Sequence, residues 1–368
     1  MGDVSEFSKE RVNTKKLSYD NYVATENMLQ DYQGIIVASN VPANTNVIKF
    51  SKGDVLLSNI RPYLKKVWFA DKNGGCSADV FVFKAFPACV PSFLHHIIAN
   101  DRFINFAMSG AKGVKMPRGD KEQMKTYEIG LPSIEEQKKI AKLLFLLDER
   151  IATQSKVIDK LQSLIKGIMA SLQNCGLKNN TWGKISLCDV LTERKELNKQ
   201  LHPVFSVSVS QGVINQIEYL GRSFAAKDTS KYHVVHYGDV IYTKSPTGDF
   251  PYGIVKQNYN QEKVAVSPLY GVYAPKDYSI GVFLHEYFKS NVNTYNYLHP
   301  LIQKGAKNTI NITNQHFLEN KVAMPLAENE LVRISNLLLS LNAKVMLMQH
   351  LKDEYERQKQ YLLRQMFV

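Results

Sequence analysis

The sequence predicts an α+β fold: two pseudo-twofold-related mixed α/β domains separated by two long antiparallel coiled-coil helices. Three observations support this prediction. The two halves of the 368-residue chain share motifs in the same order, the body of each half alternates short apolar runs with turn residues, and each half closes with an apolar stripe of heptad spacing. The segments are expected at 1–131 (first domain), 132–173 (first helix), 174–325 (second domain) and 326–368 (second helix).

The composition is that of a folded globular protein, with 44% hydrophobic and 22% charged residues. The sequence has no apolar run of about 18 residues, and MGDVSEFSKERVN lacks the apolar region of a signal peptide, so a cytoplasmic protein without a membrane role is expected. The four cysteines form no C-x-x-C pair, which favours buried reduced thiols over a metal site. The net charge of +12 suits a polyanionic partner but is weak evidence alone.

The shared motifs indicate a duplicated scaffold. GDVLLSNIRP at 53–62 matches GDVIYTKSPTG at 238–248, and a Gly-Ala-Lys loop stands at both 110–112 and 305–307. A proline follows each loop at a similar distance, Pro132 and Pro325, and the long helices come next. The sequence between these anchors diverges, so the two domains are expected to present different surfaces.

Within each body, short β-branched and aromatic runs predict strands, and two segments with helical spacing lead into the Gly-Ala-Lys loops. His95, His96 and His285 lie on these predicted helices. Because no carboxylate or cysteine stands at ligand spacing, a packing role is favoured for all three histidines.

Each long helix begins with acidic residues and then carries an apolar seam. Ser133 and Glu136 suit a capping box, and about forty residues make a rod of roughly 60 Å. In the second helix, strict heptad spacing would place Lys352 and Lys359 in the seam, so a local change of register is expected there. The predicted seam residues are Ile140, Leu144, Leu147, Ile151, Ile158, Leu161, Ile165, Ile168 and Leu172 in the first helix, and Ile334, Leu338, Leu341, Val345 and Met348 in the second.

With LPSIEEQKKIAKLLFLLDERI at 131–151, its second copy MPLAENELVRISNLLLSLNAKV at 324–345, and GDVLLSNIRPYLKKVWFA followed by GVKMPRGDKEQM, the chain resembles the specificity subunit of Type I restriction-modification systems. The resemblance covers essentially the whole chain. One departure is that TWGKISLCDV precedes the second body, whereas the first begins at MGDV, so the segment that usually precedes the first recognition domain is expected to be missing or replaced.

The resemblance implies a noncatalytic subunit whose two target recognition domains read the halves of a bipartite, asymmetric double-stranded DNA site, with the helices as spacer. It implies as partners two modification subunits, which use S-adenosylmethionine to methylate adenine, and restriction subunits, which use ATP and Mg²⁺. No cofactor or metal is expected in this chain. The exposed helix starts, by location only, are candidate contacts for the modification subunits: Glu135, Glu136, Gln137, Lys138, Lys139, Glu328, Glu330 and Arg333.

Polar and basic residues at equivalent places of the two repeats are the candidates for DNA contact, since phosphates need cations and base edges need forked donors or amides. Arg61 and Arg118 are the preferred guanine readers. The full set is Ser58, Asn59, Arg61, Lys65, Lys66, Lys112, Lys115 and Arg118 in the first domain, and Lys244, Ser245, Thr247, Lys304, Lys307, Asn308 and Asn311 in the second.

Two other interpretations stay open at this point. A coiled-coil scaffold with two protein-binding heads fits the same pattern. A recognition part of a fused methyltransferase or nuclease would need a motif that the chain lacks, such as a phosphate loop or the adenine-methyltransferase tetrapeptide. Asp79 with Lys84, or Asp239 with Lys244, would have no second acid to hold Mg²⁺, so salt-bridge or DNA-contact roles are favoured.

Overall fold

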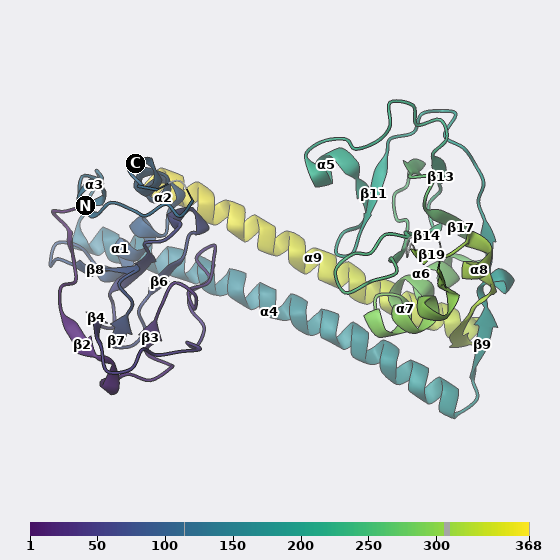
Figure 1. The fold of residues 1–368 in the computed structure, drawn as a ribbon, viewed down its shortest axis with the longest axis horizontal. Coiled ribbons are helices and arrows are strands. Elements are labelled where there is room, and N and C mark those ends of the chain that lie inside the picture. The colour runs from purple at the N-terminus through teal and green to yellow at the C-terminus, as the bar shows by residue number, and fades with distance from the viewer. Residues whose placement is uncertain (114, 305–309, 368) are drawn as a thin grey trace. The chain divides into compact units, whose positions relative to one another are not determined.

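The computed structural model describes residues 1–113, 115–304 and 310–367 (Figure 1). The chain divides into two compact units, the first made of residues 1–155 with 350–368 and the second of residues 156–349. Helices α4 (Ile134–Lys178) and α9 (Glu328–Met366) each contribute residues to both units. Each unit therefore combines one mixed α/β domain with a part of both long helices.

Each unit is built on a four-stranded antiparallel sheet, and the two sheets have the same strand order. An outer strand pairs with the strand that leads into the two following helices, that strand pairs with the one after the Gly-Asp turn, and the latter pairs with its successor. This is the duplicated scaffold that the shared motifs predict. In the first unit the order is β1 (Ser5–Phe7), β8 (Val80–Ala85), β5 (Val55–Ser58), β6 (Val67–Phe69); in the second it is β10 (Leu191–Glu193), β17 (Gly271–Pro275), β14 (Val240–Tyr242), β15 (Val255–Gln257).

A second sheet in each unit starts from an equivalent antiparallel pair and then diverges. The shared pairs are β4 with β7 in the first unit and β13 with β16 in the second. The first unit adds two strands to its pair, whereas the second carries a separate hairpin followed by the short helix α5 (Gln216–Leu220). These strands are β2 (Arg11–Asn13), β3 (Tyr22–Val23), β4 (Asn46–Phe50), β7 (Gly74–Cys76), β11 (Phe205–Ser208), β12 (Gly212–Asn215), β13 (His233–Val235) and β16 (Val264–Val266).

The remaining elements connect the sheets to the long helices. Two helices follow the main sheet in each unit, and β9 pairs with β20 in the second. The helices are α1 (Pro91–Ile98), α2 (Asp101–Ser109), α3 (Lys121–Lys125), α6 (Tyr278–Tyr287), α7 (Asn291–Leu298) and α8 (Asn314–Glu319); the 3-10 turns are η1 (Thr14–Lys16), η2 (Pro62–Leu64), η3 (Leu187–Asp189) and η4 (His299–Leu301); the strands are β9 (Trp182–Ser186), β18 (Gln303–Lys304), β19 (Ile310–Asn311) and β20 (Lys321–Pro325).

The first long helix is joined to the first domain by Gln137, whose side chain is fully buried. Its Oε1 accepts a hydrogen bond from the N–H of Val90, which caps α1, at 2.7 Å, and its Nε2 donates to the carbonyls of Ala88 and Pro132 at 3.0 and 2.9 Å. By its place in the sequence, Gln137 is a proposed contact for a partner subunit. That proposal is wrong, because the side chain is buried inside the first unit. The capping box is confirmed, since Ser133 and Glu136 exchange hydrogen bonds.

The second unit has a related anchor: Trp182 donates from Nε1 to Glu330 at 2.9 Å. Buried apolar residues of both long helices join the second domain's core, including Ile165 and Met169 of α4 and Ile334 and Leu338 of α9. By length and composition alone α9 could cross a membrane. Several apolar side chains of its first half, including Ile334 and Leu338, pack in this core.

None of the predicted seam side chains is exposed in the structure. The expected change of register is not needed at Lys359, however. In the first unit this lysine keeps its strict heptad position, its side chain is 13% exposed, and its Nζ lies 2.5 Å from the carboxylate of Asp148 on α4. One turn away, Arg150 of α4 bonds the hydroxyl of Tyr355 at 3.2 Å, so the two helices run antiparallel in this unit. An ion pair replaces an apolar contact in the seam.

The predicted burial is found for two of the histidines but for only half of the cysteines. His96 and His285 are buried, and burial lowers the pKa of each well below its usual value, which agrees with a packing role. All four cysteines are free thiols, but only Cys76 and Cys89 are buried. The expectation of buried thiols is wrong for Cys175 and Cys188, which are exposed at the end of α4 and in η3.

We expect Gln137→Ala to lower the free energy of unfolding of the first unit by about 1–3 kcal/mol, because it leaves the partly buried N–H of Val90 without its acceptor. Denaturant titration would measure the loss of stability, and hydrogen exchange of α1 and the start of α4 would show where it occurs. The control is Lys138→Ala at the exposed neighbouring position. Equal stability of the two variants would contradict the anchoring role of Gln137.

Candidate nucleic-acid interface

The candidate DNA-contacting segments after β5 and β14 follow the Gly-Asp turn that starts the central strand of each main sheet. Asp54 accepts a hydrogen bond from the N–H of Ser51 at 2.8 Å, and Asp239 accepts one from His236 at the same distance. Both glycines have positive φ, +93° for Gly53 and +86° at the matching position of the second unit. The turn fixes the first residue of the strand and hence the position at which the strand ends.

In the first unit, β5 leads into a short segment, residues 59–66, whose backbone is held from three sides. The N–H of Arg61 donates to the carbonyl of Pro117 at 2.8 Å, and those of Asp31 and Tyr32 donate to the carbonyls of Leu64 and Lys65 at 3.2 and 2.9 Å. The segment is therefore attached to the Gly-Ala-Lys loop and to the loop that follows β3.

Helix α2 supplies the third attachment through Asp101. This carboxylate pairs with Lys65 at 2.9 Å and accepts a hydrogen bond from Tyr32 at 2.8 Å. Although partial burial acts in the opposite direction, these two hydrogen bonds lower the pKa of Asp101. Lys65 therefore attaches the segment to α2, and its ammonium is already paired within the protein.

The Gly-Ala-Lys loop of the first unit forms a narrow hairpin. Lys112 and Arg118 exchange two backbone hydrogen bonds of 2.9 Å, and Arg118 also pairs with Ile60 beside the segment just described. The loop tip carries Lys115 and Met116, both exposed. The structure thus brings together the two groups of first-domain candidates, which are about fifty residues apart in the sequence.

Between these segments lies an open hollow of about 390 Å³. Arg61 and Lys66 are the predicted residues that line it, and Ser58 lies beside it, with its hydroxyl 3.1 Å from that of Thr25. The complete lining is Tyr22, Ala24, Thr25, Glu26, Ile60, Arg61, Leu64, Lys66, Ser77, Asp79 and Met116.

The predicted cations of the first domain differ in whether they are already bonded. Lys66 donates to the carbonyl of Thr25 at 2.7 Å, Lys112 pairs with Asp120 at 2.7 Å, and Arg118 pairs with Asp79 at 3.1 Å. Arg61 and Lys115 make no side-chain hydrogen bond or ion pair within the part of the chain that the structure describes. These two are the cations most available to a ligand.

In the second unit the equivalent strand, β14, leads into a hairpin at residues 243–254. Thr247 and Phe250 exchange two backbone hydrogen bonds of 3.0 Å at its tip, and Ser245 and Thr247 are exposed. Lys244 is partly buried; burial lowers its pKa, and the nearby carboxylate of Glu193 opposes that shift. The three predicted residues therefore share one hairpin.

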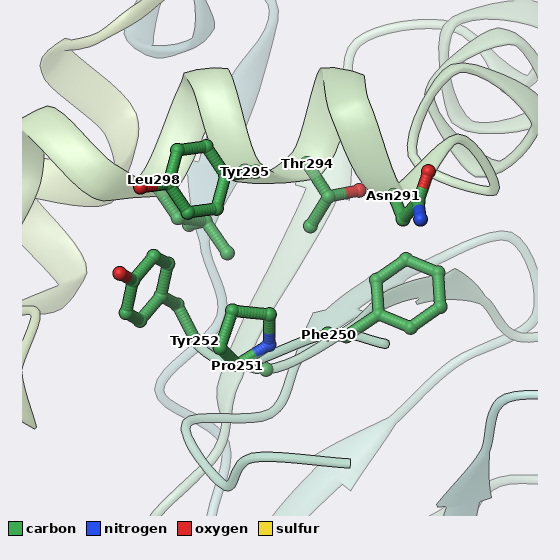
Figure 2. A pocket seen from close by; sticks show the side chains of 8 residues that line it. Phe250, Pro251, Tyr252, Asn291, Thr294, Tyr295 and Leu298 are labelled. Carbon is green, nitrogen blue, oxygen red and sulfur yellow. The ribbon is translucent and has the colours of Figure 1, made fainter. Parts of the chain in front are cut away.

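Aromatic packing against α7 fixes this hairpin. Figure 2 shows Phe250, Pro251 and Tyr252 facing Asn291, Thr294 and Tyr295 across a small cavity. The rings of Tyr252 and Tyr295 lie 5.4 Å apart. Gly253 has a φ of +99°, and a Cβ there would stand 1.8 Å from the carbonyl oxygen of Thr243, so only glycine fits this position.

The other predicted residues of the second domain belong to the loop between β18 and β19. The backbones of Lys304 and Asn311 lie in these two strands, which pair antiparallel. Lys307 and Asn308 lie outside the described residues. Their proposed contacts with DNA stay predictions, as do those of all the other candidates.

Sequence reasoning missed Thr25 and Glu26 of the hollow, because they come from the loop after β3. The salt-bridge role favoured for Asp79 and Asp239 is confirmed, with arginines as the partners. Asp79 is bonded by Arg118, and Asp239 by both Nε and Nη2 of Arg194 at 2.6 and 2.9 Å. Among the described residues, no group of three or more His, Cys, Asp and Glu side chains could hold a metal ion.

Gly253→Ala should open the hairpin that carries Lys244, at a cost of about 3 kcal/mol or more, because the added Cβ meets backbone that cannot move aside. The matched control is Gly248→Ala: this glycine also has positive φ, +51°, but a Cβ added there would have no atom within 4 Å, so a loss of about 1 kcal/mol is expected. Hydrogen exchange of β14 and β15 would compare the two, and equal protection would refute the packing argument.

Comparisons with known proteins identify the domain. Residues 1–163 match the family described as the Type I restriction modification DNA specificity domain. A segment of 73 residues is 40% identical to the Type I restriction enzyme MjaVIII specificity subunit of Methanocaldococcus jannaschii, and the match covers 20% of this chain. It spans only 17% of that relative's length.

Solved structures agree with the fold over nearly the whole chain. The S subunit of a Type I restriction-modification system from M. genitalium is similar with a TM-score of 0.63 at 13% identity, covering 100% of this chain and 94% of that one. A chain from a structural study of complex assembly and conformational transition of the Type I system gives 0.54 at 18% identity, covering 99% and 95%. The chain is thus similar to Type I restriction-modification specificity subunits in the DNA specificity domain of residues 1–163 and in fold over nearly its whole length.

Proposed function

We propose that the chain is the DNA sequence-recognition subunit of a Type I restriction-modification complex. Each domain would read one half of a bipartite, asymmetric site in double-stranded DNA. The observation that carries the proposal is the match of residues 1–163 to a DNA specificity domain, a range that includes the hollow lined by an unbonded arginine. The two units repeat one sheet but place different side chains at its loops, as two different half-sites would require.

The partners we propose are two modification subunits, joined in some complexes by restriction subunits. Support comes from one structural neighbour, which was solved in a study of complex assembly by the Type I system, and from apolar side chains that both long helices leave exposed. These side chains are Ile134, Leu143, Leu146, Leu164 and Leu177 of α4 and Leu337, Met346, Leu347 and Tyr361 of α9.

In this proposal the chain itself is noncatalytic and works in the cytoplasm. The modification subunits would use S-adenosylmethionine for adenine methylation, and the restriction subunits would use ATP and Mg²⁺. Methylation by the purified chain alone, given S-adenosylmethionine, would overturn the noncatalytic assignment. Mapping of methylated adenines in cells with and without the chain would test the recognition role directly, since one bipartite motif should appear only when the chain is present.

Replacement of Arg61 should change which sequences are bound, whereas replacement of Lys115 should change only how tightly they are bound. Arg61→Ala removes a forked donor from the hollow, so discrimination at one position should fall by about 1–3 kcal/mol. Lys115→Ala removes an exposed cation, so affinity should fall evenly and depend less on salt. Binding of a randomised duplex library by the assembled complex measures both, and an even loss for Arg61→Ala would exclude base reading.

Lengthening both helices should change the spacer of the DNA site. Seven residues added to α4 after Ser155 and seven to α9 before His350 fall between the two units, so they leave the contacts of each unit intact. A heptad adds about 10 Å and nearly preserves the helix face. The preferred spacer should grow by about three base pairs. Insertion into α4 alone is the control, and an unchanged spacer in an active double insertion would show that the helices do not set it.

A further inference from the structure

The hollow of the first unit is lined by four charged side chains, two of which are already bonded within the protein. Lys66 donates to the carbonyl of Thr25, and Asp79 accepts from Arg118. Glu26 and Arg61 make no side-chain hydrogen bond or ion pair with any described residue, although both line the same hollow. One forked donor and one carboxylate acceptor are thus left open to a ligand.

Arg61 is held in a conformation that an unfolded chain would rarely adopt. Its φ of 51° and ψ of 62° are left-handed, and the next residue is Pro62, which further disfavours a helical backbone before it. Such backbone persists where the surrounding structure enforces it, and it is concentrated at binding sites. Here the hydrogen bond from Arg61 to Pro117 and the one from Leu64 back to Arg61 enforce it.

Glu26 is held in place just as firmly by its neighbour. Asn27 is 3% exposed; its side chain accepts from the N–H of Ala24 at 2.6 Å and donates to the carbonyl of Ile36 at 2.9 Å. This buried amide closes the turn at 24–27 and leaves Glu26 exposed at its tip. The carboxylate is therefore presented at the hollow by a fixed backbone and not by a long free loop.

An exposed carboxylate is unexpected in a DNA interface, because it repels phosphate. It becomes favourable when it accepts a hydrogen bond from a base, and in the major groove the amino group of cytosine is such a donor. The guanine paired with that cytosine presents two acceptors, O6 and N7, which match the fork of an arginine. The two open side chains of the hollow are thus complementary to the two members of a single base pair.

We infer that Arg61 and Glu26 together read one G·C base pair in the half-site of the first domain, with Arg61 donating to guanine O6 and N7 and Glu26 accepting from cytosine N4. This inference rests on the proposed function and deepens it, since it adds a specificity-determining acidic residue and fixes the class of base pair. Lys66 holds the carbonyl of Thr25, the residue before Glu26, and Asp79 holds the side chain of Arg118, the residue after Pro117.

The experiment selects sequences from a randomised duplex DNA library with the chain assembled with its modification subunits. Glu26→Ala is compared with Glu6→Ala, an exposed carboxylate on β1 outside the hollow, so both variants lose one negative charge. Arg61→Lys keeps the charge but loses the fork, and it identifies the position that Arg61 reads. Circular dichroism and melting of each complex establish that the variants are folded.

Glu26→Ala is expected to reduce the preference for G·C by about fivefold or more at the position that Arg61→Lys also relaxes. Glu6→Ala is expected to leave every position unchanged. The inference is overturned if Glu26→Ala gives the same base preferences as Glu6→Ala, or if it relaxes a different position from Arg61→Lys. If the unaltered complex selects no sequence at all, the proposed function fails, and the inference fails with it.

Discussion

The register of one strand in each domain determines where the candidate recognition residues that follow this strand stand. A slip of one residue would turn each side chain of that strand to the opposite face of the sheet. The Gly-Asp turn prevents this, because a carboxylate that accepts a backbone N–H three residues earlier allows one closure of the turn. Burial raises the pKa of Asp54, and the hydrogen bond from Ser51 opposes this shift. The turn is the part of the scaffold that both domains keep.

Beyond the far end of this strand, the two domains diverge, and they do so by different means. The first encloses a hollow with a strained segment, a narrow hairpin and the loop after β3, which hold one another by backbone hydrogen bonds. The second extends a hairpin that aromatic rings attach to α7. A shared sheet with separately anchored loops allows a loop to change without disturbing the core, which is how one scaffold can carry two specificities.

The long helices are attached to their domains by buried polar groups and not only by apolar packing. Gln137 makes three hydrogen bonds that link the start of α4 to α1 and to the strand-helix connection before it. Within the seam of the first unit, Lys359 and Asp148 replace an apolar contact. Polar groups of this kind require one alignment, because any shift of the helix would leave them buried without partners.

The sequence by itself determined the duplicated plan, the heptad seams, the capping box and the loops in which polar residues would gather. All of these are periodic or local, so spacing is enough to reveal them. Only the tertiary structure decided the burial of Gln137, the place of Lys359 in the seam, the exposure of Cys175, and which cations of the first domain are already bonded. Glu26 entered the candidate site in the same way, since a loop some thirty-five residues before Arg61 brings it there. Such contacts depend on how distant segments pack, and no local pattern records that packing.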